Sequence, residues 1–213
     1  SRNRNAPSKD SDGTFKRALV LDLIARNPVD AIRGRLGRED RERRQAEWLT
    51  EPELRAFLDR AAVLELRHYP FFLSMATTGV RFGEALGLQV GDVDVAGGRL
   101  QIRRQIRKHR IVSPKSAKPR TVYVPPAAMA VLRGWMDTVR AEAAVKGTEP
   151  LWLFPGATGQ PIEDKAPRRA FPRCLKAAGI TRRIRPHDLR HTYASLAIQR
   201  GVPTHTAASH SSS

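Results

Sequence analysis

Cysteine is almost absent from this 213-residue chain, which contains only Cys174. A single thiol cannot form a disulfide framework within the chain, and such usage is typical of a reducing compartment, so we predict a cytoplasmic protein. Long apolar runs are also missing, because the early run from Ala18 to Ala25 is short and contains Asp22. A membrane-spanning helix needs about 20 mostly apolar residues, so the sequence predicts no membrane segment.

Acidic residues are scarce as well. Lysine and arginine outnumber aspartate and glutamate by 38 to 21, which gives a formal net charge of +17 and a pI near 11.3. The region from Val95 to Met136 contains no acidic residue at all. A surplus of this size favours a polyanionic partner, and we predict double-stranded DNA.

The length allows one large domain preceded by a fragment. Phe15 to Arg26 has helical spacing and stops before Asn27-Pro28, a pair that breaks helices. A mixed-charge stretch from Arg33 to Arg44 follows, as in a solvated linker. We therefore predict a disordered start, one helix and a linker in residues 1–45, and the main domain in residues 46–213.

Hydrophobic periodicity predicts a mainly α-helical domain with one small antiparallel β-sheet, an α+β fold. Thr50 and Glu53 have the spacing of a capping box, which indicates a helix start. The apolar stretch from Tyr69 to Thr78 predicts a buried helix, and Gly79 is suited to end it in the left-handed conformation. Further helices are expected at 82–88, 125–144, 166–178 and from 186 onward, and strands at 99–106, 121–124 and 151–154.

Two separate segments contain candidate phosphate ligands. Arg81 lies between two predicted helices, where free backbone N–H groups and the helix dipole favour an anion, and Glu84 could hold its guanidinium group. The strands predicted at 99–106 and 121–124 would form a basic antiparallel hairpin, and Lys115 lies at its tip, from which a lysine can reach a phosphate.

The last predicted helix has one basic face. At about 100° per residue, His187, Arg190 and His191 share an arc, and an apolar face made of Leu189, Tyr193 and Leu196 lies opposite. An arginine offers a fork of donors that fits a phosphate, and histidine titrates near neutral pH. This set of side chains favours phosphoryl chemistry.

Three motifs in this order resemble the catalytic domain of the tyrosine recombinases, the phage integrase family. The matching segments are TTGVRFGEALGL at 77–88, Pro114-Lys115 ahead of RTVYVP at 120–125, and HDLRHT at 187–192 running to Gly201-Val202-Pro203. The resemblance covers roughly residues 46–203. It implies a catalytic domain that is truncated at both ends, with residues 15–27 similar to the end of the family's N-terminal core-binding domain.

The resemblance also implies site-specific DNA recombination or integration, with strand cleavage through a phosphotyrosyl intermediate and without a metal or other cofactor. Arg81 and Arg190 would bind the non-bridging oxygens of the scissile phosphate. Lys115 would protonate the leaving 5′ oxygen, and His187 would assist proton transfer.

Other residues would support this site or bind DNA. Glu84 would lie behind Arg81, His191 would support the helix face, and His210 is a candidate for the family's late active-site histidine. The predicted DNA contacts are Arg103, Arg104, Arg107, Lys108, Lys118, Arg168, Arg169 and Arg173.

The family's nucleophilic tyrosine has no match in this sequence. Tyr69 falls in a buried helix, Tyr123 in the sheet and Tyr193 on the core side of its helix, so none is placed to attack. We therefore expect the chain as written to be inactive, lacking the C-terminal nucleophile segment. Full-length relatives act as homotetramers on DNA, and we expect this chain alone to be monomeric.

Two other interpretations stay open. The chain could be a non-catalytic, DNA-binding remnant of an integrase, with a steeply salt-dependent affinity for duplex DNA. Alternatively, His187 and His191 could bind zinc together with Cys174, His205 or His210, although the glutamate of a zinc-protease motif is missing between the two histidines.

Overall fold

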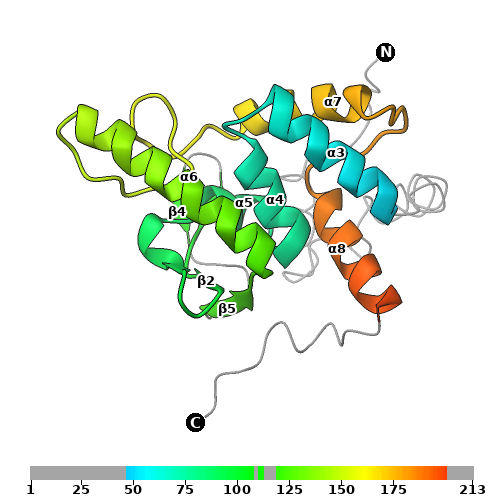
Figure 1. Cartoon of the computed structure of the whole chain (residues 1–213), viewed down its shortest axis with the longest axis horizontal. Helices are drawn as coiled ribbons and strands as arrows, with labels where there is room; N and C mark the ends of the chain where they lie inside the picture. The colour runs from blue at the N-terminus through cyan, green and yellow to red at the C-terminus, as the bar shows by residue number, and fades with distance from the viewer. Residues whose placement is uncertain (1–46, 108–109, 113–118, 201–213) are drawn as a thin grey trace, which may run out of the picture. The chain divides into compact units, whose positions relative to one another are not determined.

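In the computed structural model, which describes residues 47–107, 110–112 and 119–200, helix α4 (Tyr69–Thr78) occupies the centre of the fold. All but two of its ten residues are buried, as its apolar sequence requires. Figure 1 shows α4 between α6 on one side and α8 on the other, with α3 packed across it. These helices span Glu51–Leu64 (α3), Pro126–Val145 (α6) and Asp188–Gln199 (α8).

The helix ends follow the signals in the sequence. The predicted capping box is present at α3, where the backbone N–H of Thr50 donates to a carboxylate oxygen of Glu53 over 2.8 Å. Gly79 ends α4 with φ +63°, in the left-handed region. Helix α7 (Lys165–Ala177) packs against α3, and Phe57 on α3 meets Phe171 on α7 with ring centroids 4.8 Å apart.

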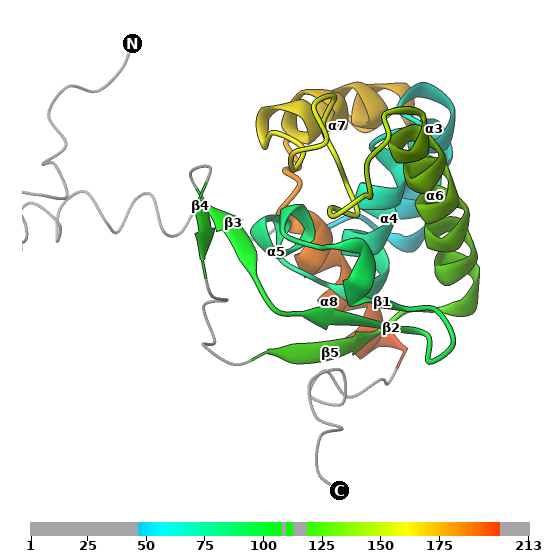
Figure 2. The ribbon, with the colours of Figure 1, turned by 90° about the vertical axis from the view of Figure 1, so that its left-hand side faces the viewer.

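The predicted mainly helical α+β fold is confirmed, but the described residues form two separate antiparallel sheets rather than one. Strands β1 (Val93–Asp94), β2 (Arg99–Ile102) and β5 (Arg120–Tyr123) form an antiparallel sheet in the order β1-β2-β5. The chain leaves this sheet after Ile102 and forms a second hairpin from β3 (Gln105–Arg107) and β4 (Arg110–Val112). Figure 2 shows this hairpin set apart from the three-stranded sheet and beside α5.

The predicted strand at 151–154 is also wrong. Its side chains are buried, apart from Leu151, but it makes only an isolated bridge between Trp152 and Gln89. Its neighbour is not a strand but the short segment from Leu88 to Val90, which connects α5 (Phe82–Leu86) to the 3-10 turn η1 (Val90–Asp92), so a regular ladder cannot form. None of the helices in the described part of the chain is both long and apolar enough to cross a lipid bilayer.

Candidate functional site

The junction between α4 and α5 brings two predicted arginines together. Arg81 is the N-cap residue of α5, directly after the left-handed Gly79 and the buried Val80. Arg190 comes from α8, which packs along α4, and its guanidinium group donates a hydrogen bond to the backbone carbonyl of Gly79. Two segments more than 100 residues apart in sequence thus meet at one turn of the backbone.

Behind Arg81 lies Glu84, a carboxylate with no exposed surface. Arg81 donates to it twice, through its backbone N–H over 2.8 Å and its guanidinium group over 2.9 Å. The predicted contact between Arg81 and Glu84 is therefore present. Arg120 at the start of β5 adds two parallel hydrogen bonds of 2.8 and 2.6 Å, so the carboxylate accepts four hydrogen bonds.

The four hydrogen bonds that the Glu84 carboxylate accepts also change its pKa. Burial by itself raises the pKa, but the hydrogen bonds and charges of Arg120 and Arg81 outweigh it and lower the pKa from its ordinary 4.5 to about 2. Glu84 is therefore ionised throughout the physiological range. Its negative charge fixes the two arginines and neutralises only one of them.

Sequence reasoning missed Arg120 as part of this site, although a signal was present. Along β5 and the residue after it, Val122 and Val124 are buried while Tyr123 is exposed. Because side chains alternate along a strand, Arg120 belongs to the buried face. A buried arginine requires a carboxylate partner, and Glu84 was the candidate within the predicted motif.

Arg81 and Arg120 therefore bind one carboxylate, and Arg190 lies close enough to interact electrostatically with all three groups. Burial lowers the pKa of Arg190, and the positive charges of Arg81 and Arg120 lower it further. Such mutual repulsion is relieved when an anion binds among the cations. The described site thus carries an excess positive charge that a phosphate could neutralise.

His187 is the N-cap residue of α8 and lines the same cleft as Arg81. Partial burial lowers its pKa, and the nearby His191 ring, at a centroid distance of 5.4 Å, lowers it further. The imidazole is consequently neutral near pH 7 and can exchange a proton. His191 itself is exposed, at the edge of this pair.

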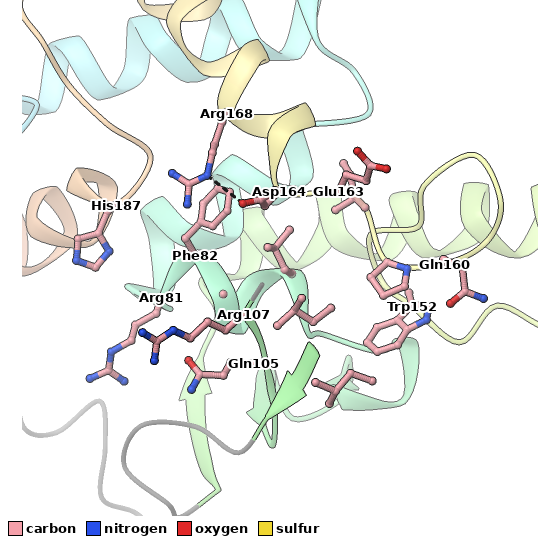
Figure 3. Close-up of a pocket in the computed structure, with 16 residues that line it drawn as sticks. Arg81, Phe82, Gln105, Arg107, Trp152, Gln160, Glu163, Asp164, Arg168 and His187 are labelled. Atoms are coloured by element: carbon pink, nitrogen blue, oxygen red, sulfur yellow. Dashed lines mark ion pairs between the residues drawn. The ribbon is translucent and has the colours of Figure 1, made fainter. Parts of the chain in front are cut away.

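A cleft of about 870 Å³ opens beside the arginines. Figure 3 shows Arg81, Arg107 and His187 at one side of it, while Glu163 and Trp152 lie on the other. The floor between them is largely apolar. An anion is therefore favoured only at the arginine side, away from the acidic wall.

The other predicted site residues have different outcomes. Lys108, Lys115, Lys118 and His210 lie outside the described residues. Arg103 is exposed and lies 3.8 Å from a carboxylate oxygen of Asp92, and Arg169 is exposed. Arg168 lies over the Phe82 ring, with its guanidinium carbon 4.4 Å from the centroid, beside the cleft.

Two further predicted DNA contacts, Arg104 and Arg173, form close ion pairs with carboxylates of the protein. Arg104 is largely buried and paired with the buried carboxylate of Asp92, which is a structural role rather than a free DNA contact. Arg173 is paired with Glu65, on the outer side of α7. Both therefore have a protein carboxylate as partner in this structure.

The three tyrosines lie outside the cleft. Tyr123 is exposed on β5, while Tyr69 and Tyr193 line a separate groove between α3, α4 and α8. Tyr193 and Leu196 were predicted on the core side, and the structure corrects this to half-buried positions. The side chain that is fully buried on this helix besides Leu189 is Thr192, whose hydroxyl accepts the backbone N–H of Leu49 over 3.0 Å.

The zinc interpretation finds no support in the described residues, among which no group of three or more His, Cys, Asp or Glu side chains is arranged to hold a metal ion. Cys174 is buried in the core, and burial raises the pKa of its thiol to about 11. Zinc binds the thiolate, which this environment disfavours. His205 and His210 lie outside the described residues.

Comparison with known proteins gives a consistent result. The family model of the phage integrase family matches residues 47–211. The tyrosine recombinase XerC of Corynebacterium glutamicum is 33% identical over 146 residues, which is 68% of this chain and 40% of that protein. The chain spans about half the length or less of the curated relatives it matches first.

Solved structures share the fold. The XerA recombinase superposes with a TM-score of 0.61 at 26% identity, covering 73% of this chain and 52% of that one. The Tn1549 transposon integrase, solved in complex with a circular intermediate DNA, superposes with a TM-score of 0.70 at 18% identity, covering 94% of this chain and 73% of that one. The mostly helical fold with small antiparallel sheets is therefore that of a tyrosine recombinase catalytic domain.

Proposed function

Because the chain belongs to the phage integrase family of tyrosine recombinases, we propose that its described domain binds the scissile phosphodiester of double-stranded DNA for site-specific recombination. The observation that supports this most is the cluster of Arg81, Arg120 and Arg190, in which one buried carboxylate, Glu84, binds only the first two. The Tn1549 integrase, which has the same fold, was solved bound to DNA. The net charge of +17 favours the same partner.

In the proposed reaction, a tyrosine oxygen attacks the phosphorus, the bond to the 5′ oxygen breaks, and that oxygen takes up a proton. Negative charge grows on the non-bridging oxygens, where the guanidinium groups of Arg81 and Arg190 would bind it. His187, neutral near pH 7, would share or transfer a proton. Lys115 as proton donor and His210 as a further ligand stay predictions.

The test of the phosphate site is DNA affinity as a function of salt. We expect Arg190→Ala to weaken binding to a 30-base-pair duplex by roughly 10- to 100-fold, because a charge-assisted hydrogen bond contributes about 1.5–3 kcal/mol. The slope of log affinity against log salt should fall by about one, the contribution of one phosphate. Arg140→Ala, on the exposed face of α6 and paired with Asp137, is the control. Equal slopes for the two variants would contradict the proposal.

Cleavage by this polypeptide is a separate question, because none of the three tyrosines lines the cleft that holds Arg81. We propose that the 213-residue chain binds DNA without forming a phosphotyrosyl bond. Incubation with a nicked duplex, followed by a denaturing gel, should show no covalent protein–DNA adduct. An adduct that disappears when Tyr69, Tyr123 or Tyr193 is changed to phenylalanine would refute this expectation and identify the nucleophile.

A further inference from the structure

The hairpin of β3 and β4 is attached directly to the helix that follows Arg81. Gly83, on α5, and Gly87, at its end, lie four residues apart and face the backbone of β3. A Cβ atom built on Gly83 would lie 2.8 Å from the carbonyl oxygen of Ile106, and one on Gly87 would lie 3.1 Å from that of Arg104. A Cβ atom on Gly83 would therefore require the strand to shift away from α5, and one on Gly87 would make a tight contact with the backbone before it.

A buried ion pair fixes the base of the same hairpin. Arg104 pairs with Asp92, which is 2% exposed and also accepts the backbone N–H of Gln89 over 2.9 Å. The guanidinium group of Arg104 donates in addition to the carbonyl of Gly87 over 3.3 Å. The hairpin is thus tied to both ends of the segment from Gly87 to Asp92. Its position relative to Arg81 is set by packing rather than by a flexible connection.

The outer end of the hairpin carries an unneutralised pair of charges. Arg107 and Arg110 are directly opposite each other in the strand register, and both are exposed. Within the described residues, neither forms an ion pair with a carboxylate. Like charges in opposite positions of an antiparallel pair are destabilising, by roughly 0.2–1 kcal/mol. The arrangement therefore costs free energy unless an anion lies against it.

We propose that the β3–β4 hairpin is a second contact to the DNA backbone, in which Arg107 and Arg110 bind phosphates at a fixed offset from the phosphate held by Arg81. The inference rests on the proposed function, because it takes duplex DNA as the ligand. Arg81 and Arg107 line the same side of the cleft (Figure 3), so one continuous backbone can reach both. Gly83 and Gly87 act as positioning residues, since they permit the contact between α5 and β3.

The decisive variant is Arg107→Gln combined with Arg110→Gln. We expect the slope of log affinity against log salt on duplex DNA to fall by about two, since each lost phosphate contact removes about 0.9. The control is Arg55→Gln combined with Arg140→Gln, which changes the net charge equally on α3 and α6, where both arginines have acidic neighbours. A slope no different from that of the control would overturn the inference.

Hydroxyl-radical footprinting separates this inference from the proposed phosphate site. The variant with Arg107→Gln and Arg110→Gln should lose protection of a DNA backbone segment that Arg190→Ala leaves protected. Arg190→Ala should lose protection of a different backbone segment, which the hairpin variant leaves protected. If only the hairpin variant changes the footprint, the proposed phosphate site fails while the hairpin contact stands. If only Arg190→Ala changes it, the hairpin inference is wrong and the proposed function stands.

The positioning role of Gly83 is tested by DNA binding of Gly83→Ala alone and combined with the two arginine substitutions. Gly83→Ala removes no charge, yet it should weaken DNA binding because it displaces β3 from α5. When Arg107 and Arg110 are already glutamine, Gly83→Ala should weaken DNA binding little further. Additive losses in the combined variant would show that Gly83 acts on DNA binding by another route. A thermal unfolding curve for each variant identifies any general loss of folding.

Discussion

Glutamine in place of Glu84 is expected to lower the free energy of unfolding by about 3–5 kcal/mol at pH 7, the usual cost of removing one partner from a buried ion pair. The carboxylate has no exposed surface and accepts four hydrogen bonds from Arg81 and Arg120. The amide cannot neutralise either guanidinium group, and its NH₂ group would point at donors. Urea unfolding at pH 7 measures the difference.

A matched control is Glu142→Gln, because Glu142 also binds an arginine, Arg67, but at the surface. Exposed pairs contribute roughly 0–1 kcal/mol, so this variant should be nearly as stable as the parent chain. If Glu84→Gln were equally mild, the buried cluster would not hold the junction of α4 and α5 together. A smaller cost of Arg120→Met in the Glu84→Gln background than in the parent would show that the two residues act as a pair.

The same cluster predicts how stability depends on pH. The folded-state pKa of Glu84 is lowered from 4.5 to about 2, so its contribution is complete above about pH 4.5 and is lost as the pH falls toward 2. The penalty of Glu84→Gln should therefore shrink over this window. Urea unfolding at pH 3 and pH 7 for both proteins provides the comparison.

Local signals in the sequence predicted the helices well because their causes are local. The capping box at Thr50 and Glu53 and the left-handed Gly79 involve contacts within a few residues, and the apolar stretch of α4 requires burial whatever surrounds it. The motif around Arg81 likewise indicated Glu84, three residues on. These features could be read without knowing the rest of the fold.

The parts that were missed depend on partners distant in sequence. The strand predicted at 99–106 breaks because Arg104 pairs with the buried Asp92 and because Gly83 admits β3 against α5. Periodicity gave only a weak signal of this: Arg103, Arg104 and Gln105 interrupt the alternation, but Ile106 resumes it in the same phase as Ile102. Arg120 pairs with Glu84 across 36 residues, and only the strand register reveals on which face it lies.

The apolar side of the last helix shows a further limit of periodicity. The pattern correctly places Leu189 in the core, but it cannot tell how deeply Tyr193 and Leu196 are covered. Thr192 is the buried polar residue on this helix because its hydroxyl binds Leu49, a partner 143 residues away. Hydrophobicity alone would have placed that threonine at the surface.

Alanine in place of Gly79 is expected to destabilise the domain by roughly 2–5 kcal/mol and to weaken DNA binding as well. The left-handed φ of +63° costs a side chain about 1–2 kcal/mol. A Cβ atom at this position would also lie 2.4 Å from Cδ1 of the Tyr193 ring, and overpacking of this kind costs typically 1–3 kcal/mol. Because the carbonyl of Gly79 accepts a hydrogen bond from Arg190, any shift of this turn displaces the proposed phosphate ligand.

Two further variants separate the backbone cost of the left-handed φ at Gly79 from the steric cost of the contact with Tyr193. Gly159 has φ +77° and open space where a Cβ atom would lie, so Gly159→Ala should show the backbone cost alone, about 1–2 kcal/mol. Tyr193→Ala should relieve the steric part in the Gly79→Ala background, so the double variant would be more stable than the sum of the single effects allows. Thermal unfolding gives the stabilities, and duplex DNA affinity at fixed salt gives the effect on Arg190. If Gly79→Ala cost no more than Gly159→Ala and left DNA affinity intact, the contact between α4 and α8 would not position Arg190.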